Sequence, residues 1–208
     1  GAAMQALRVA VVQGDTRWHD APANRAYYGG LVRQLPASDL IVLPETFLSG
    51  FSNDIAASAE PMDGEGVAWL RALAGEMGAV ICGSLAIREG GTVYNRLLWM
   101  RPDGSFAQYD KRHLFRMSGE HTRYGSGGER LIVELKGWRV LPQVCYDLRF
   151  PVWLRNRRLA AATGGMEYDL AVFVANWPSP RRNAWRTLLR ARAMENLCCV
   201  VGVNRVGV

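Results

Sequence analysis

Long apolar runs are missing from this 208-residue sequence, and lysine is scarce. No apolar stretch approaches the roughly 20 residues needed to span a bilayer, so a membrane-spanning protein is not expected. We expect no basic and apolar leader before the first strand pattern. Only two of the 25 basic residues are lysines, Lys111 and Lys136, while arginine supplies the other positive charges. A lysine in this chain is therefore less expected to be a simple surface residue.

Paired cysteine motifs are also missing. The four cysteines stand at positions 82, 145, 198 and 199 and form no CxxC pair and no Cys/His spacing typical of a metal site. We therefore expect no disulfide framework and no metal, which favours a reducing, cytoplasmic location. Cys82, Cys198 and Cys199 lie in apolar runs and are interpreted as small buried strand residues. Cys145 differs because polar and charged residues follow it directly.

A concentrated basic stripe is not present either. The net charge of +6 could indicate nucleic-acid binding. However, the positive residues are dispersed among carboxylates, and the densest cluster, Arg155, Arg157 and Arg158, falls in an expected helix. We interpret that cluster as a solvated helix face and expect no nucleic-acid partner.

Short apolar runs recur along the chain and are typical of buried strands. Most are continuous rather than alternating, which favours sheets covered on both faces. The expected strands are 7–12, 40–43, 79–87, 93–100, 131–135, 138–144, 170–175 and 197–203. The expected helices are 24–35, 65–77, 151 to about 161, and 182–196.

Two tight connections interrupt the alternation of strands and helices. Residues 88–92 and the pair Lys136-Gly137 each join two strand runs, which predicts antiparallel hairpins. The sequence therefore predicts one α/β domain over residues 1–208 with mixed sheets, in which residues 1–4 are a non-native or flexible extension. The longest expected loop is 116–130, and loops of that length are often functional.

Three strand runs end in residues that can carry chemistry. One expected strand ends at Glu45, another at Cys145, and a third at Asn176-Trp177. In α/β sheets, sites gather beyond the carboxyl ends of strands. Lys111 lies between these strand ends in the sequence. A carboxylate, a cation and a thiol form a coherent set for acyl transfer.

Each of these residues also has an ordinary structural interpretation. Glu45 could cap a turn or pair with an arginine, Lys111 could be a surface cation, and Cys145 could be a core thiol. The functional alternatives are a general base, an oxyanion clamp, and a nucleophile whose thiolate is favoured by nearby positive charge. A Cys–His hydrolase remains open, because His113 and His121 follow Lys111 closely.

Taken together, three sequence blocks resemble the nitrilase superfamily of carbon–nitrogen hydrolases. They are Leu-Pro-Glu-Thr-Phe at 43–47, Tyr-Asp-Lys-Arg-His-Leu-Phe at 109–115 and Gln-Val-Cys-Tyr-Asp-Leu-Arg-Phe-Pro at 143–151, in the order of the family. Within that superfamily, the stretches 45–51, 111–115 and 175–178 most resemble the omega-amidase (2-oxoglutaramate amidase) branch.

The resemblance implies roles for individual residues. Glu45 corresponds to the general base, Lys111 to the catalytic lysine, Cys145 to the nucleophile and Glu120 to a second glutamate beside the lysine. It further implies a four-layer αββα sandwich, a homodimer formed through the helices around the nucleophile, and no metal or organic cofactor. Family members continue past the strand near 204, so a further C-terminal segment is expected.

The implied reaction is hydrolysis of the terminal amide of a small omega-amido acid, with water, through a cysteine thioester. The backbone N–H of Tyr146 is the second expected oxyanion donor. A substrate carboxylate needs a cation, for which Arg149 and Arg116 are the candidates. The favoured interpretation of Arg149 is nevertheless structural, an ion pair with Asp147 or Glu195. Phe47 and Trp177 are expected to wall the pocket, or simply to pack.

Two classes of alternative remain. One is a different hydrolase of the superfamily, such as a nitrilase, a carbamoylase or a deaminated-glutathione amidase, with the same catalytic residues. The other is a catalytically idle interaction protein on the same scaffold. The presence of Glu45, Lys111 and Cys145 favours an enzyme.

Overall fold

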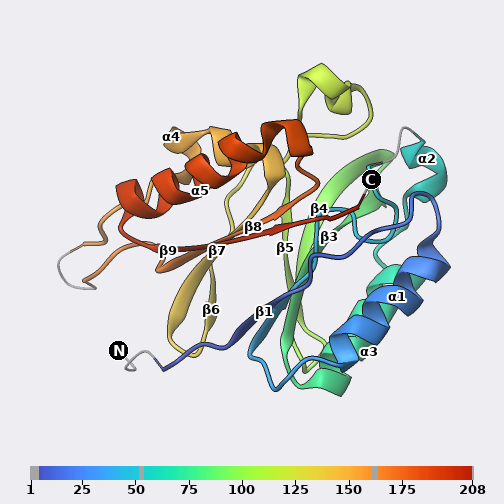
Figure 1. Cartoon of the computed structure of the whole chain (residues 1–208), viewed down its shortest axis with the longest axis horizontal. Helices are drawn as coiled ribbons and strands as arrows, with labels where there is room; N and C mark the ends of the chain where they lie inside the picture. The colour runs from blue at the N-terminus through green and yellow to red at the C-terminus, as the bar shows by residue number, and fades with distance from the viewer. Residues whose placement is uncertain (1–4, 52–53, 161–163, 208) are drawn as a thin grey trace.

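The structure is a computed structural model that describes residues 5–51, 54–160 and 164–207. Residues 1–4, which the sequence predicts to be an extension, lie outside the described residues. Two β-sheets form the centre of the molecule (Figure 1).

The first sheet has the strand order β1-β2-β3-β4-β5. Its strands are β1 (Val9–Val11), β2 (Leu40–Val42), β3 (Val80–Glu89), β4 (Thr92–Met100) and β5 (Phe106–Asp110). The β1–β2 and β2–β3 pairs are parallel, while the β3–β4 and β4–β5 pairs are antiparallel.

The second sheet has the order β6-β7-β8-β9. Its strands are β6 (Val133–Leu135), β7 (Trp138–Val144), β8 (Leu170–Ala175) and β9 (Cys199–Asn204). The β6–β7 pair is antiparallel and the other two pairs are parallel. The predicted α/β class with mixed sheets is therefore confirmed.

Helices cover the outer face of each sheet, giving four layers (Figure 1). Helices α1 (Ala21–Arg33) and α3 (Glu65–Met77) lie on the first sheet, and α4 (Pro151–Leu154) and α5 (Arg182–Asn196) lie on the second. The short helix α2 (Ile55–Ser58) lies near one end of the first sheet. The αββα order predicted from the family resemblance is confirmed.

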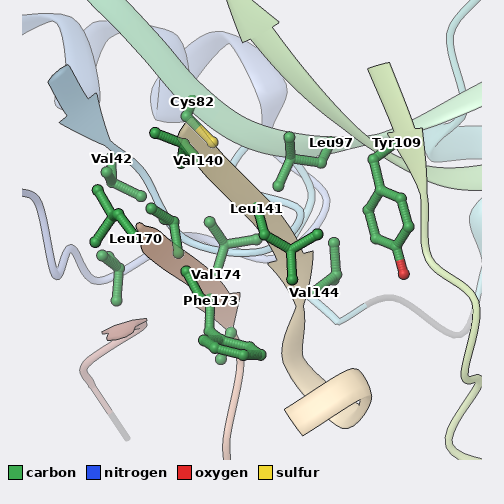
Figure 2. Close-up of a cluster of buried hydrophobic side chains, with 14 of the residues drawn as sticks. Val42, Cys82, Leu97, Tyr109, Val140, Leu141, Val144, Leu170, Phe173 and Val174 are labelled. Carbon is green, nitrogen blue, oxygen red and sulfur yellow. The ribbon is translucent and has the colours of Figure 1, made fainter. Parts of the chain in front are cut away.

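Alternate residues of the inner strands serve two separate cores. In β2, Leu40 and Val42 pack between the sheets, whereas Ile41 packs under α1 and α3. Figure 2 shows the inter-sheet core, where Val42 and Cys82 of one sheet meet Val140 and other side chains of the second sheet. Because both faces of these strands are buried, their sequence is continuously apolar.

Both predicted hairpins are present. The pair Gly90-Gly91 joins β3 to β4, and Lys136-Gly137 joins β6 to β7. All four of these residues have positive φ angles, between 50° and 82°. Two consecutive left-handed residues form the turn that matches the twist of a two-residue hairpin.

Some predicted elements were wrong. The helix that starts at Pro151 ends at Leu154, and Arg155, Arg157 and Arg158 are not helical. Tertiary hydrogen bonds replace the helix, because Asn156 bonds to Asn196 and Tyr168 instead. The end of that prediction, residue 161, lies outside the described residues.

Strand β5 was missed because it is an edge strand. Its residues alternate between exposed and buried positions and form no apolar run. The prediction for two cysteines was also wrong: Cys199 is exposed, and Cys198 is half-buried and precedes β9. Strand β9 is likewise an edge strand, so one side of it is open to solvent.

Among the described residues, no helix has the length and apolar character needed to cross a membrane.

Candidate active site

Four polar side chains from distant parts of the chain meet in one buried cluster. Glu45 follows β2, Lys111 follows β5, and Cys145 follows β7. Glu120 lies in a short 3₁₀ turn of the predicted long loop. All four line the same pocket, and Glu45, Lys111 and Glu120 are each 1% exposed. The structure thus brings together the four residues that the sequence selected.

The ammonium group of Lys111 lies between two carboxylates. Its Nζ is 3.0 Å from Glu45 Oε2 and 2.8 Å from Glu120 Oε1. Burial alone would lower the pKa of Lys111, but the charges of the two glutamates outweigh burial and raise it well above its usual value. Lys111 is therefore a cation in the folded protein.

Glu120 is held by the lysine and by the backbone. Besides its contacts with Lys111, its Oε1 accepts a hydrogen bond from Phe115 N at 3.3 Å. Burial raises the pKa of Glu120, and the charge of Glu45 adds to this, although Lys111 opposes both.

Glu45 accepts hydrogen bonds from three nitrogen donors, and the Cys145 thiol also forms a hydrogen bond with its carboxylate. Asn95 Nδ2 donates to Oε2 at 2.8 Å, Lys111 Nζ donates to the same oxygen at 3.0 Å, and Asn176 N donates to Oε1 at 3.0 Å. The sequence did not indicate Asn95, because it stands in the middle of a strand rather than at its end. These contacts fix the orientation of the carboxylate.

The turn that carries Cys145 is strained. Cys145 starts a 3₁₀ turn (Cys145–Arg149) directly after β7 and has a φ angle of 44°. A left-handed conformation costs a non-glycine residue roughly 1–2 kcal/mol. Such strain persists only where the surroundings enforce it. Here Asp147 Oδ2 accepts from Val144 N at 3.2 Å, and Arg192 Nε donates to Leu148 O at 2.9 Å.

The positive charge of Lys111 is not the dominant influence on the Cys145 thiol. Burial raises the pKa of the Cys145 thiol well above its usual value, the charge of Glu45 raises it further, and Lys111 only partly opposes this. The resting residue is therefore a thiol, which needs a base in order to become a nucleophile. Glu45 is the neighbouring carboxylate.

Asp147 connects the cysteine turn to the segment that carries Lys111. It is fully buried, and its carboxylate accepts from Tyr109 Oη at 2.6 Å and from His113 N at 3.0 Å. His113 Nδ1 also lies 2.8 Å from Asp147 Oδ1, and the imidazole stacks on Phe150. The histidine thus faces Asp147, and none of the described residues lining the pocket is a histidine. This geometry disfavours the Cys–His alternative.

The pocket above the cluster has a volume of about 860 Å³. Aromatic side chains form much of its wall: Trp18, Phe51, Phe115, Tyr146, Trp177 and Trp185. Arginines also line it: Arg149, Arg181, Arg182, Arg186 and Arg205. An anionic group in the pocket would therefore find cationic partners.

The four further side chains that the sequence predicted for the substrate pocket lie in different places. Trp177 lines the pocket as predicted, and so does Arg149, whose guanidinium lies 5.1 Å from the centre of the Trp177 ring. Phe47 does not, because it is fully buried against Tyr28 on the other side of the first sheet. Arg116 is exposed and is not among the pocket-lining residues.

The favoured structural interpretation of Arg149 was also wrong. Asp147 is occupied by Tyr109 and His113, and Glu195 pairs with Arg192 at 3.0 Å. Within the described residues, Arg149 forms none of the ion pairs. Its guanidinium therefore stays available in the pocket.

In the described ranges, no group of three His, Cys, Asp or Glu side chains could hold a metal ion.

Comparisons with known proteins agree with this geometry. A carbon–nitrogen hydrolase family model matches residues 8–208. The chain is 48% identical over 204 residues to an omega-amidase, YafV, from Yersinia enterocolitica, covering 98% of this chain and 76% of the relative. It is 35% identical over 175 residues to a 2-oxoglutaramate amidase from Bacillus subtilis, covering 82% of this chain and 64% of that protein.

A solved structure is also very similar. The protein XC1258 from Xanthomonas campestris, a carbon–nitrogen hydrolase superfamily protein crystallised with an arsenic adduct in its active site, superposes with a TM-score of 0.96. It is 60% identical, and the match covers 99% of this chain and 78% of that one.

Proposed function

The chain belongs to the carbon–nitrogen hydrolase family and acts on amides, and we propose that its substrate is a small omega-amido acid of the 2-oxoglutaramate or 2-oxosuccinamate type. The observation that carries this proposal is the buried cluster of Glu45, Lys111, Glu120 and Cys145 in a pocket lined with arginines. The names of two relatives, an omega-amidase and a 2-oxoglutaramate amidase, support the same substrate class.

In the proposed first step, Glu45 removes the proton from the Cys145 thiol while the sulfur attacks the amide carbonyl carbon. The carbonyl oxygen becomes an oxyanion. Lys111 stabilises it through its positive charge, and the backbone N–H of Tyr146 donates a hydrogen bond to it. Because the thiol is protonated at rest, attack requires the neighbouring carboxylate.

In the second step, Glu45 passes its proton to the amide nitrogen, the carbon–nitrogen bond breaks, and ammonia leaves. The acyl group remains on the sulfur as a thioester. Glu45 then takes a proton from a water molecule, which attacks the thioester carbonyl. The acid leaves, and the cysteine sulfur recovers its proton.

Glu120 acts through Lys111 in this proposal. It forms a second ion pair with the lysine besides that of Glu45 and contributes to the high pKa of the ammonium group. The lysine therefore stays charged and fixed while the oxyanion forms, so little reorganisation is needed at that moment.

Arg149 is the proposed partner of the distal substrate carboxylate. It lines the pocket, it packs on Trp177, and the two carboxylates predicted to neutralise it have other partners. A planar guanidinium can bind a carboxylate through two parallel hydrogen bonds. Arg149 would thereby select amides that carry a second, anionic end.

The proposal is tested by measuring ammonia release from a panel of compounds, with wild type and Arg149→Ala. The panel contains 2-oxoglutaramate, 2-oxosuccinamate, succinamate, glutamine, deaminated glutathione, the neutral amide butyramide and a simple nitrile. We expect wild type to prefer the small omega-amido acids. In the variant, KM for these acids should rise roughly 10- to 100-fold, since hydrogen bonds to a charged group are lost, while butyramide is unaffected.

Arg116→Ala is the matched control, because that arginine is exposed and lies outside the pocket lining. It should leave every KM unchanged. Release of ammonia from the nitrile alone would contradict an amidase with this substrate class. An equal effect of Arg149→Ala on butyramide would remove the role assigned to Arg149.

We also propose that the enzyme is a homodimer formed through α4 and α5. Three large apolar side chains stand exposed there: Val152 at 84%, Met194 at 77% and Leu197 at 82%. Exposed apolar residues gathered in one region often mark an interface. In sedimentation velocity, wild type should run as a dimer and Met194→Asp as a monomer. Met117→Asp, at an equally exposed methionine on the loop, should remain dimeric.

The proposed location is the cytoplasm. All four cysteines are free thiols, which matches a reducing compartment. Cell fractionation that placed the activity in an extracellular fraction would contradict this.

A further inference from the structure

The two oxygens of the Glu45 carboxylate accept different numbers of hydrogen bonds from nitrogen donors. A carboxylate offers about four acceptor positions, two on each oxygen. Within the described part of the chain, Oε2 accepts from two nitrogen donors, Asn95 Nδ2 and Lys111 Nζ, whereas Oε1 accepts from one, Asn176 N. The Cys145 thiol also forms a hydrogen bond with this carboxylate. The nitrogen donors thus occupy both positions on Oε2 and leave one position on Oε1.

We propose that Asn95 is a positioning residue that, together with Lys111, fills Oε2 and so leaves Oε1 as the oxygen that exchanges protons with Cys145. This inference rests on the proposed role of Glu45 as the base. Without Asn95, Oε2 would have an open position as well, and the carboxylate could turn away from the thiol. With Asn95, the base is held in one orientation before the substrate arrives.

The surroundings of Asn95 support a specific contact rather than simple packing. Asn95 is 1% exposed, and its Oδ1 has no hydrogen-bond partner among the described residues. A buried amide oxygen without a partner is unfavourable. The amide nevertheless keeps its N–H₂ group toward Glu45, because the opposite orientation would place two oxygens against each other.

Asn95 also holds Lys111. Its backbone carbonyl accepts a hydrogen bond from Lys111 N at 3.0 Å. A single residue of the inner strand β4 therefore fixes Glu45 through its side chain and Lys111 through its backbone. Placement on a packed strand gives the cluster a more rigid support than a loop would.

The pH dependence of activity distinguishes positioning from packing. The titratable groups that face Glu45 are Lys111, Glu120, Cys145 and Tyr124. None of them is replaced when Asn95 is changed. Loss of one hydrogen bond to the carboxylate disfavours its ionised form. The acidic limb of the kcat/KM profile should therefore move to higher pH.

The experiment compares Asn95→Ala and Asn95→Asp with wild type, using the amide that wild type hydrolyses fastest. For Asn95→Ala we expect kcat to fall roughly 10- to 100-fold, KM to change little, and the acidic limb of the pH profile to move to higher pH. Asn95→Asp keeps the size of the side chain, but its carboxyl group can donate only when protonated. Its activity relative to wild type should therefore increase as the pH is lowered.

Asn156→Ala is the matched control, since Asn156 is a buried asparagine in the loop after α4 that has its own hydrogen bonds and does not line the pocket. It should reduce thermal stability without moving the acidic limb. Wild-type pH profiles for both Asn95 variants would overturn the inference, and so would an Asn95→Asp protein as active as wild type at every pH. Activity in Cys145→Ala would instead overturn the proposed function itself.

Discussion

Replacing Cys145 with alanine should lower amide turnover roughly 10⁴- to 10⁶-fold while the fold is retained. Loss of a nucleophile in comparable catalytic sets has effects of this size. Alanine is smaller than cysteine and lacks only the sulfur, so the substitution introduces no steric clash in the turn after β7. The measurement is steady-state ammonia release, with circular dichroism and thermal unfolding as checks of folding.

Cys199→Ala is the matched control for this prediction. Cys199 is the exposed cysteine, on the edge strand β9, and it does not line the pocket. This variant should turn over like wild type. If Cys145→Ala kept more than a few per cent of the activity, the nucleophile would have to be another group.

Replacing Lys111 with methionine should abolish turnover and also lower the free energy of unfolding by about 3–5 kcal/mol at neutral pH. The reason is that Glu45 and Glu120 would remain buried with no cation between them. Chemical denaturation monitored by tryptophan fluorescence measures the loss. Lys136→Met is the control, because Lys136 is 37% exposed and its partner Asp39 keeps a second contact with Arg8. Lys136→Met should lower the free energy of unfolding by about 1 kcal/mol or less.

The decrease in the free energy of unfolding caused by Lys111→Met should depend on pH. Burial and the charge of Glu45 already raise the pKa of Glu120, and removing the opposing charge of Lys111 raises it further. The folded variant therefore binds a proton that the unfolded chain releases above about pH 4.3. Its stability is highest below that pH and falls as the pH rises toward the raised pKa of the folded state. A destabilisation that was equal at pH 5 and pH 8 would contradict the buried carboxylate pair.

Much of the site could be predicted because its main residues stand at the ends of apolar strands. Leu40 to Val42 is continuously apolar since one face meets the second sheet and the other meets α1 and α3, so its end at Glu45 is visible in the sequence. The same holds for Val144 before Cys145. Parallel β7, β8 and β9 bring such ends to one edge of the sheet.

The remaining features depend on tertiary contacts that no local pattern encodes. Asn95 is a polar residue inside a strand, and only the antiparallel pairing of β4 places it against Glu45. Phe47 stands two residues after Glu45, yet the turn at Thr46, with a φ angle of 44°, directs it into the other core. Arg149 could not be assigned because its two expected partners bind other residues: Asp147 bonds to the distant Tyr109, and Glu195 pairs with Arg192 on the same helix.

The central claim, amide hydrolysis through a thioester on Cys145, is tested most directly by a single-turnover experiment. Excess enzyme is mixed with the preferred omega-amido acid and quenched in acid at successive times. Free ammonia, free acid and the mass of the protein are then measured. The mechanism predicts that ammonia appears before the acid, with the difference present as an acyl group on the peptide that contains Cys145. Simultaneous release of ammonia and acid, with unmodified protein at every time, would contradict it.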